Sequence, residues 1–356
     1  MSINVGLIGS GLVGTALLEQ LASHGSPKIN IIAILSTSKL ILHTPTPSTP
    51  GLDLSNWKKQ LPKAKPADLH IFEEHLARNG PSCIVDCTAS ADIASKYVGW
   101  MKRNIHVVTP NKKAFSGDFK VWKEIRSIHV SGKALCFHEA TVGAGLPILS
   151  TLYDMIATGD EVVKVEGIFS GTLSYIFNNF SSTSSASSST FSQIVKGAKE
   201  LGYTEPDPRD DLNGMDMARK VVILGRIAGL NLSLETLDVE NIVPTELRSC
   251  PTADEFMSKL PGSDDHFRAL NYLARAGGEV LRYVGVVDPK GASSVKLMRY
   301  PASHPFAGMK GSDNVIAITT QRFPNPLIIQ GAGAGDAVTA FGVFSDLLKV
   351  WSSVAK

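Results

Sequence analysis

Short apolar runs alternate with segments of helical pattern over the first third of the chain. Four runs predict buried strands, at residues 4–10, 29–36, 82–88 and 106–110. Each is followed by a turn and a helix-compatible segment, the first of which predicts a helix over 14–24. Continuous apolar strands that alternate with helices are typical of a parallel sheet covered on both faces. The pattern therefore predicts an α/β fold with a doubly wound N-terminal domain over residues 1–150.

The pattern changes after residue 150. It predicts a strand over 162–171, helices over 173–180 and 191–201, and a long apolar helix over 211–229. Four later runs alternate in the manner of an antiparallel sheet, at 279–288, 292–300, 314–323 and 326–335. We expect a mixed α+β domain over 151–335. The final helix, 336–356, opens at a glycine-rich turn, and we expect it to pack back on the first domain.

Composition excludes several classes of protein. The chain has 356 residues, 43% of them hydrophobic, and a net charge of +2 without a basic cluster, which argues against a nucleic-acid binder. No apolar run approaches the ~20 residues that span a bilayer, so we expect no membrane partner. The four cysteines have no CxxC spacing, which favours a reducing, cytoplasmic setting. Nine of the ten residues of 181–190 are Ser or Thr, which predicts a surface loop.

A glycine motif follows the first predicted strand. Gly9, Gly11 and Gly14 form GxGxxG between a strand and a helix, where they allow a tight turn, close approach of a pyrophosphate and helix packing. The motif predicts a Rossmann-type dinucleotide site; a tight turn without a ligand is the alternative. The second strand ends at residues 35–39, LSTSK, without the carboxylate typical of NAD sites. This slightly favours NADP and leaves NAD open.

Two further strand ends offer polar groups at the same edge of the sheet, where α/β folds bind ligands. Thr88, Ala89 and Ser90 follow one strand and could contact nicotinamide or ribose. Lys112 follows the next strand and could project towards the reactive end of the cofactor. An ordinary solvent-exposed lysine is an equal alternative.

The segment EPDPRDDLNGMDMARK, residues 205–220, holds five carboxylates and three cations directly before an apolar run. On a helical wheel of about 100° per residue, Asp216 and Lys220 share the inward stripe with Ile223 and Ile227. Arg219 and Arg226 fall on a flank that we expect to be wetter. A partly buried lysine beside a carboxylate suits proton transfer, although an ordinary helix-surface pair has the same spacing.

The acids upstream of the helix could bind a substrate ammonium. Glu205, Asp210 and Asp211 are candidates, and Asp211 could instead cap the helix. The acids lack the spacing of a calcium loop, and no histidine joins them. The glycine-rich loop 138–147 carries one acid, Glu139, which with backbone carbonyls could hold a cation; a hinge between domains is the alternative.

Together these motifs resemble the homoserine dehydrogenase family in its short, monofunctional, fungal-type form. The resemblance covers nearly the whole chain. Besides GxGxxG it rests on TPNKKAF (109–115), HEATVGAGLPI (138–148), GIFSGTLSYIFN (167–178), LGYTEPDPRDDLNGMDMARK (201–220), SHPFAGMKGSDN (303–314) and QGAGAGDAVTA (330–340). It implies reversible NAD(P)-dependent oxidation of L-homoserine to L-aspartate 4-semialdehyde, on the route to threonine, methionine and isoleucine. It also implies a homodimer formed through strands of the second domain.

The resemblance assigns site residues by motif. Lys220 is the acid/base, assisted by Lys112. The substrate residues are Glu205, Asp216, Asp211, Gly171, Thr172 and Tyr203. The cofactor residues are Gly9, Gly11, Leu12, Val13, Gly14, Thr88, Ala89, Ser90, Lys112 and Gly335. Glu139, Val142, Ala144 and Leu146 match a sodium-binding loop. Asp336, directly after Gly335, stands where a smaller residue is expected. A dehydrogenase for another amino-acid-derived substrate and a non-catalytic dinucleotide sensor remain alternatives.

Overall fold

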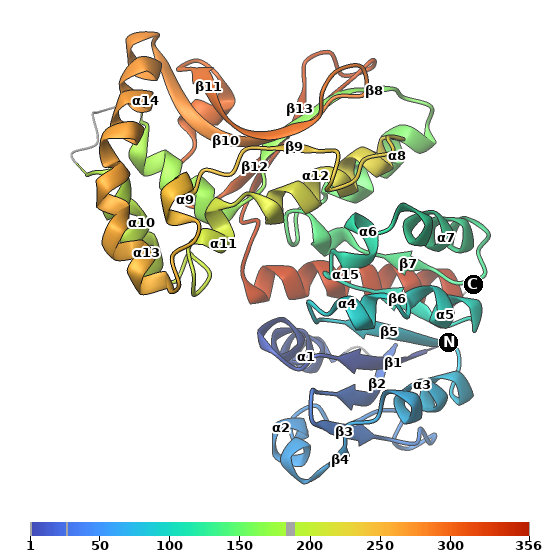
Figure 1. Cartoon of the computed structure of the whole chain (residues 1–356). Coiled ribbons are helices and arrows are strands. Elements are labelled where there is room, and N and C mark those ends of the chain that lie inside the picture. Colours follow the sequence, from blue (N-terminus) through green and yellow to red (C-terminus); the bar gives the residue numbers. More distant parts are fainter. Residues whose placement is uncertain (1, 26–27, 183–188, 356) are drawn as a thin grey trace. The chain divides into compact units, whose positions relative to one another are not determined.

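The chain forms two compact units in a computed structural model that describes residues 2–25, 28–182 and 189–355 (Figure 1). The first unit contains residues 1–146 and 334–356, and the second contains residues 147–333. The serine-rich stretch 181–190, expected to be a loop, lies largely outside the described residues. That the two units act as cofactor and substrate domains stays a prediction at this point.

A seven-stranded sheet forms the centre of the first unit, in the order β4-β3-β2-β1-β5-β6-β7. Five strands are parallel: β1 (Ile3–Ile8), β2 (Ile29–Leu35), β5 (Ser82–Asp86), β6 (His106–Val108) and β7 (Cys136–Phe137). They confirm the predicted parallel sheet. Two strands that the sequence did not indicate, β3 (Lys39–Leu42) and the edge strand β4 (Lys65–Pro66), run antiparallel to their neighbours. Both are short, and β4 contains a proline, so neither carries a strand pattern.

Helices cover both faces of this sheet. Val5 and Leu7 of β1 face a core that also contains Leu17 of α1 and Leu347 of α15. Gly6 faces the other side, where an added Cβ would lie 2.5 Å from Leu76 of α3. The helices of this unit are α1 (Leu12–His24), α2 (Trp57–Gln60), α3 (Leu69–Arg78), α4 (Ala91–Ala94), α5 (Tyr97–Lys102), α6 (Lys113–Ser116), α7 (Phe119–Val130) and α15 (Asp336–Val354), with 3-10 turns η1 (Leu61–Lys63) and η2 (Glu139–Thr141).

Helix α15 is long and apolar enough, by length and composition, to cross a membrane. The sequence analysis did not single it out, because charged residues such as Asp346 and Lys349 interrupt its apolar run. Its buried side chains belong to the core of the first unit, and the Gln20 side chain of α1 donates to the Ala337 carbonyl oxygen at 2.8 Å. We therefore interpret α15 as a core helix of this unit.

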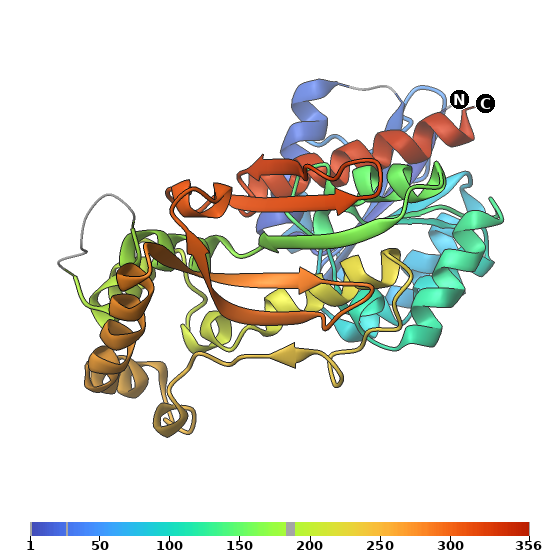
Figure 2. The ribbon, with the colours of Figure 1, turned by 90° about the horizontal axis from the view of Figure 1, so that it is seen from above.

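A six-stranded sheet forms the second unit, in the order β13-β12-β8-β10-β11-β9 (Figure 2). Its strands are β8 (Val162–Ile168), β9 (Asp238–Val239), β10 (Glu279–Val287), β11 (Ser294–Pro301), β12 (Asn314–Thr320) and β13 (Leu327–Gly331). The long strands pair antiparallel, as the alternating pattern predicts. Only the two-residue β9 pairs in parallel, with β11, among the strands described.

The helices of the second unit differ from expectation in two respects: some were not predicted, and one begins later than predicted. They are α8 (Ile148–Ala157), α9 (Gly171–Phe180), α10 (Phe191–Glu200), α11 (Arg209–Leu212), α12 (Met215–Ile227), α13 (Ala253–Lys259) and α14 (Asp264–Ala276), with 3-10 turns η3 (Thr245–Leu247), η4 (Leu260–Ser263) and η5 (Pro305–Gly308). The sequence analysis missed α8, α13 and α14. The continuous helix predicted over 211–229 is wrong at its start, because Gly214 has a left-handed φ of 76° and separates α11 from α12.

Two buried arginines hold this unit together. Arg226 was expected on a wetter flank, but it is only 1% exposed, and its Nε donates to the Leu232 carbonyl oxygen at 3.0 Å. The returning segment covers that flank of α12, which the wheel alone could not reveal. Arg282, also 1% exposed, donates to five backbone carbonyls, those of Phe306, Phe177, Ser181, Leu281 and Ala307. Arg282 therefore ties the C-terminal end of α9 to β10 and η5.

Candidate active site

Lys220 is buried on α12 and its ammonium group contacts two oxygen atoms. Its Nζ lies 2.8 Å from Asp216 Oδ2, one helical turn earlier, and 2.5 Å from the carbonyl oxygen of Phe169 at the end of β8. The Lys220 side chain is 10% exposed, whereas that of Asp216 is 52% exposed. The predicted inward position of Lys220 is thus confirmed, with Asp216 at its solvent-facing end. This arrangement fixes an amine at a defined position, as proton transfer requires.

Thr172 and Asp211 meet next to the strand end that holds Lys220. Thr172 follows Ser170, which caps α9, and its Oγ1 lies 2.5 Å from the Tyr203 carbonyl oxygen and 2.9 Å from Asp211 Oδ1. The other carboxylate oxygen of Asp211 accepts from the Glu205 backbone amide at 2.8 Å. Residues 169–172 therefore contact both Lys220 and Asp211, which brings the predicted acid/base and a predicted substrate acid to one short segment.

Burial raises the pKa of Asp211 to about 6, and the nearby charges of Glu205 and Asp216 act in the same direction. The hydrogen bonds from the Glu205 amide and from Thr172 oppose this shift. Asp211 accordingly changes its charge near neutral pH. It does not cap α12, whose N-cap is Gly214, although it lies in the first turn of the short helix α11.

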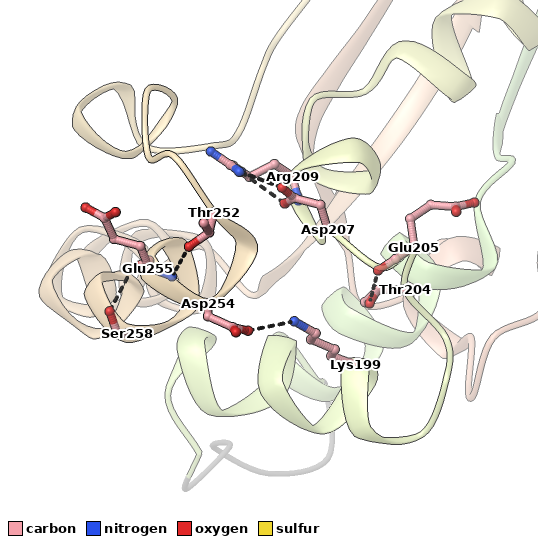
Figure 3. A network of polar contacts seen from close by, with 9 residues as sticks. All are labelled: Lys199, Thr204, Glu205, Asp207, Arg209, Thr252, Asp254, Glu255 and Ser258. Atoms are coloured by element: carbon pink, nitrogen blue, oxygen red, sulfur yellow. Dashed lines mark hydrogen bonds and ion pairs between the residues drawn. The ribbon is translucent and has the colours of Figure 1, made fainter.

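In the loop before α11, Glu205 is exposed, whereas Asp207 is bound by Arg209. Arg209 forms an ion pair with Asp207 at 2.5 Å and donates to the Cys250 carbonyl oxygen at 2.5 Å. The hydrogen bonds from Arg209 lower the pKa of Asp207. In Figure 3 the Glu205 carboxylate points away from this pair, while Lys199 and Asp254 approach each other nearby. Asp207 is thus a structural acid, and Glu205 is an available one.

Tyr203 and Gly171 complete this group. Tyr203 is 42% exposed and stacks on Tyr175 of α9 with ring centroids 4.7 Å apart. Gly171 is the first residue of α9. The structure therefore brings together the predicted residues of the second unit around the N-terminal end of α9 and the start of α12. These are Lys220, Asp216, Asp211, Glu205, Gly171, Thr172 and Tyr203.

The glycine motif of the first unit has the geometry that a dinucleotide requires. Gly9 has a left-handed φ of 91°. A Cβ at Gly14 would lie 2.0 Å from the Gly9 carbonyl oxygen, so only glycine lets α1 approach the turn. No atom lies within 4 Å of a Cβ built on Gly11, the N-cap of α1, which leaves space for a phosphate at the helix N-terminus. Leu12 is 79% exposed beside it, and Val13 is half-buried.

The other predicted cofactor residues of this unit lie in the loop after β5 or at the N-termini of helices α4, α6 and α15. A Cβ at Gly9 would lie 2.8 Å from Thr88 Cγ2, so the glycine turn and the loop after β5 are adjacent. Ala89 is exposed, and Ser90 caps α4 through its side chain. Lys112 is the N-cap of α6. Gly335 has a φ of 105° and is the N-cap of α15, and Asp336 accepts a bond from its neighbour's amide at the exposed start of that helix.

The loop expected to hold a cation packs against α15. Glu139 is 7% exposed, and its Oε2 lies 3.7 Å from the ammonium of Lys349. Lys349 also pairs with the buried Asp346 at 2.8 Å. Ala144 has a left-handed φ of 53°, which turns the loop sharply. Lys349 is therefore shared between two carboxylates and lies nearer Asp346 than Glu139. A cation here could use Glu139 together with backbone oxygens such as those of Val142, Ala144 and Leu146. No cluster of three or more His, Cys, Asp or Glu side chains suited to a metal occurs in the described ranges.

The sequence analysis missed two kinds of contributor. The Phe169 carbonyl oxygen is a backbone atom that no residue pattern marks. Arg209 was counted only as part of a charged segment, although its spacing of two residues from Asp207 was a usable signal for a local ion pair.

Comparison with known proteins agrees over both units. Residues 9–138 match the family model for the homoserine dehydrogenase NAD binding domain, and residues 147–348 match the model for homoserine dehydrogenase. The homoserine dehydrogenase of Emericella nidulans is 48% identical over 362 residues, covering 98% of each chain. A chloroplastic bifunctional aspartokinase/homoserine dehydrogenase 2 of Zea mays is 48% identical over 99% of this chain, which spans only 39% of the maize protein.

Solved structures show the same fold. A Candida auris protein of unknown function has a TM-score of 0.93 at 45% identity, covering 99% of this chain and 98% of its own. A hyperthermophilic archaeal homoserine dehydrogenase in complex with NADPH has a TM-score of 0.75 at 23% identity, covering 98% of both chains, and supports the fold alone. With both units matched and a relative of nearly equal length almost half identical, this chain belongs to the homoserine dehydrogenase family.

Proposed function

We propose that the chain is an NAD(P)-dependent oxidoreductase that interconverts L-homoserine and L-aspartate 4-semialdehyde. The observation that carries this proposal is the buried Lys220 held between Asp216 and the Phe169 carbonyl, beside the Thr172–Asp211 pair. A dinucleotide sensor would need no such buried amine in a second unit. Family membership supplies the substrate class.

In the proposed oxidation, Lys220 in its neutral amine form accepts the hydroxyl proton of homoserine, and the hydride on C4 of homoserine leaves, so that the alcohol becomes an aldehyde. A bound nicotinamide cofactor would supply the acceptor for this hydride. In the reverse direction Lys220 returns the proton to the carbonyl oxygen. Lys112 assists by stabilising negative charge on that oxygen. A lysine suits this role because its amine can exist in both protonation states within a partly buried site.

The acids bind and orient the substrate. Glu205 is exposed and accepts the substrate ammonium, and Asp211 adds a second carboxylate whose charge varies near pH 6. Asp216 holds Lys220 and takes part in substrate binding. Gly171, Thr172 and Tyr203 form the remaining wall at the start of α9.

NADP is the slightly favoured cofactor, and NAD remains an alternative. Residues Ser36–Lys39 at the end of β2 offer hydroxyls and no carboxylate to ribose oxygens. The Lys39 ammonium donates to the Ala64 carbonyl oxygen at 3.3 Å, so it would have to turn to reach a 2′-phosphate.

A sodium ion at the loop of Glu139, Val142, Ala144 and Leu146 is part of the proposal. Because Lys349 lies nearer Asp346 than Glu139, the Glu139 carboxylate would join the backbone oxygens in binding a monovalent cation. We further propose a homodimer, in line with the family resemblance. The four free cysteines are consistent with a reducing, cytoplasmic setting. The route served is the synthesis of threonine, methionine and isoleucine.

The test is an absorbance assay of nicotinamide reduction with L-homoserine, run with NADP and NAD separately. We expect reduction that depends on homoserine, with the lower KM for NADP. Reduction with another small amino-acid-derived alcohol but not with homoserine would redirect the substrate assignment. Cofactor binding without any turnover would favour a dinucleotide sensor and overturn the proposal.

A further inference from the structure

A fully buried carboxylate lies beneath the two loops that carry the predicted nicotinamide contacts. Asp86, the last residue of β5, is 0% exposed. Its Oδ1 accepts from the Thr88 amide at 2.8 Å, and its Oδ2 accepts from Asn111 Nδ2 at 2.9 Å and from the Tyr97 hydroxyl. A buried charge without partners is costly, so these three donors fix both the carboxylate and the groups that contact it.

Asn111 joins the loop after β5 to the loop after β6. One amide hydrogen of its Nδ2 is donated to Asp86 and the other to the Ser90 carbonyl oxygen, at 2.9 Å each. Its Oδ1 accepts from the Lys113 amide at 3.0 Å. These three contacts determine which terminal atom of the Asn111 side chain is the oxygen and which is the nitrogen. They also place Asn111 directly between Ser90 and Lys112, the residue that precedes Lys113.

The remaining contacts close the network on the backbone side. Thr109 Oγ1 donates to the Asp86 carbonyl oxygen at 2.8 Å and accepts from the Asn111 amide at 2.8 Å. The Tyr97 hydroxyl, on α5, also lies 3.0 Å from Thr109 Oγ1. None of these side chains is exposed, so none can contact bound substrate directly. Their effect is to hold Thr88, Ser90 and Lys112 in one mutual arrangement.

We propose that Asp86, Asn111 and Tyr97 are positioning residues, which set the nicotinamide-contact loop against the loop of Lys112. The inference rests on the proposed function, because it takes Lys112 and residues 88–90 to face the cofactor. It goes beyond that function because it assigns the relative position of these two loops to a buried hydrogen-bond network. Displacement of a reacting group by about 1 Å can reduce the rate by about a hundredfold.

The test exchanges the two partners of the central hydrogen bond. In Asp86→Asn, the new amide faces the Asn111 amide, and one donor loses its acceptor. In Asn111→Asp, two carboxylates face each other. The double variant Asp86→Asn with Asn111→Asp restores one donor and one acceptor in reversed order. The donation to Ser90 is lost, and the Tyr97 hydroxyl loses the Oδ2 acceptor that it shares with Asn111. We expect each single variant to lower kcat about tenfold or more with a smaller change in the KM for homoserine, and the double variant to recover part of that loss.

Tyr97→Phe keeps the ring and removes one donor. It therefore tests the network with a milder change if the other variants fold poorly. Asp160→Asn is the matched control, because Asp160 is an 8% exposed carboxylate of the second unit whose partners are Thr320 and Arg322. Each variant is also measured for its melting temperature and for NADPH affinity by fluorescence. A double variant no better than the worse single variant, or kcat losses that follow the melting temperature alone as in Asp160→Asn, would overturn the inference.

Amide hydrogen exchange separates this inference from the proposed function. In Asp86→Asn the amide of Thr88 should exchange faster, and in Asn111→Ala that of Lys113 should. This result does not depend on homoserine being the substrate. Unchanged exchange of both loops would contradict the positioning role even if homoserine is turned over. A wild-type protein inactive with homoserine would instead contradict the function.

Discussion

The ammonium group of Lys220 lies 2.8 Å from the carboxylate of Asp216, yet the two side chains differ in exposure, at 10% and 52%. The Asp216 carboxylate therefore contacts the buried amine from the solvent-exposed N-terminal turn of α12. The Phe169 carbonyl oxygen contacts the same nitrogen from the end of β8. An amine oriented by two oxygens from different elements is held by the fold rather than by its own flexible chain. The account of this protein depends on that geometry.

Glu205→Gln should raise the KM for homoserine with little change in kcat. The exposed carboxylate loses its charge but keeps its shape, so only the attraction for the substrate ammonium is removed. An exposed ion pair contributes up to about 1 kcal/mol, so the KM should rise about fivefold. Glu200→Gln, at the exposed end of α10, is the control. An unchanged KM would remove Glu205 from the substrate site.

The pH dependence of homoserine binding should follow Asp211. Since burial raises its pKa to about 6, its carboxylate is neutral below that pH and charged above it. The KM for homoserine should therefore fall as pH rises through about 6. Asp211→Asn should lack this step and keep a high KM throughout. Steady-state kinetics between pH 5 and pH 8 with both proteins make the comparison, and identical profiles would exclude Asp211.

Asp211 should also make the free energy of unfolding depend on pH. Its pKa is raised in the folded state above the ordinary value of 3.8, so between these two pH values the folded state binds more protons than the unfolded state. Its contribution to the free energy of unfolding consequently falls as pH rises from about 4 to about 6 and is constant above. Urea unfolding of the wild type minus that of Asp211→Asn isolates the contribution. A difference that rises over this interval would contradict the assignment.

Arg282→Lys should destabilise the protein although it preserves the charge. The guanidinium donates to five carbonyl oxygens, and a lysine offers three donors from one point. Carbonyls left unpaired in a buried position cost about 1–3 kcal/mol each, so the free energy of unfolding should fall by about 2 kcal/mol or more. Arg268→Lys, which replaces a 68% exposed side chain, should change it little. Equal unfolding curves for the two variants would show that the carbonyl contacts of Arg282 are not needed.

The sequence predicted the elements whose environment is uniform. Buried parallel strands such as β1 and β2 are apolar except for Asn4 and Asn30. The long strands β10 and β12 belong to runs of near-alternating pattern, so both sheets could be recognised. The helices α13 and α14 were missed, although α14 buries Phe267 and Ala274 at a helical spacing of seven residues. The break at Gly214 was also missed: its left-handed φ of 76° separates two helices, and the Tyr283 hydroxyl, which would lie 2.1 Å from an added Cβ, is distant in sequence.

The candidate site was predictable where function depends on side-chain type at a local spacing. Asp216 and Lys220 are one helical turn apart, so periodicity alone placed the lysine inward. The wheel failed at Arg226, because the segment that follows α12, which includes Leu232, covers it. The Asp86–Asn111 contact joins residues 25 positions apart, and the Phe169 carbonyl is a backbone group. Neither is visible before the chain is folded.

The most direct test of the account is turnover by Lys220→Ala, measured beside Lys196→Ala, which removes a 70% exposed lysine of α10. We expect Lys220→Ala to bind NADPH with an affinity close to that of the wild type while its kcat for homoserine falls by about a hundredfold or more, the scale of general acid/base catalysis. Lys196→Ala should retain full activity. A kcat near the wild-type value in Lys220→Ala would contradict the role of Lys220 and with it the proposed mechanism.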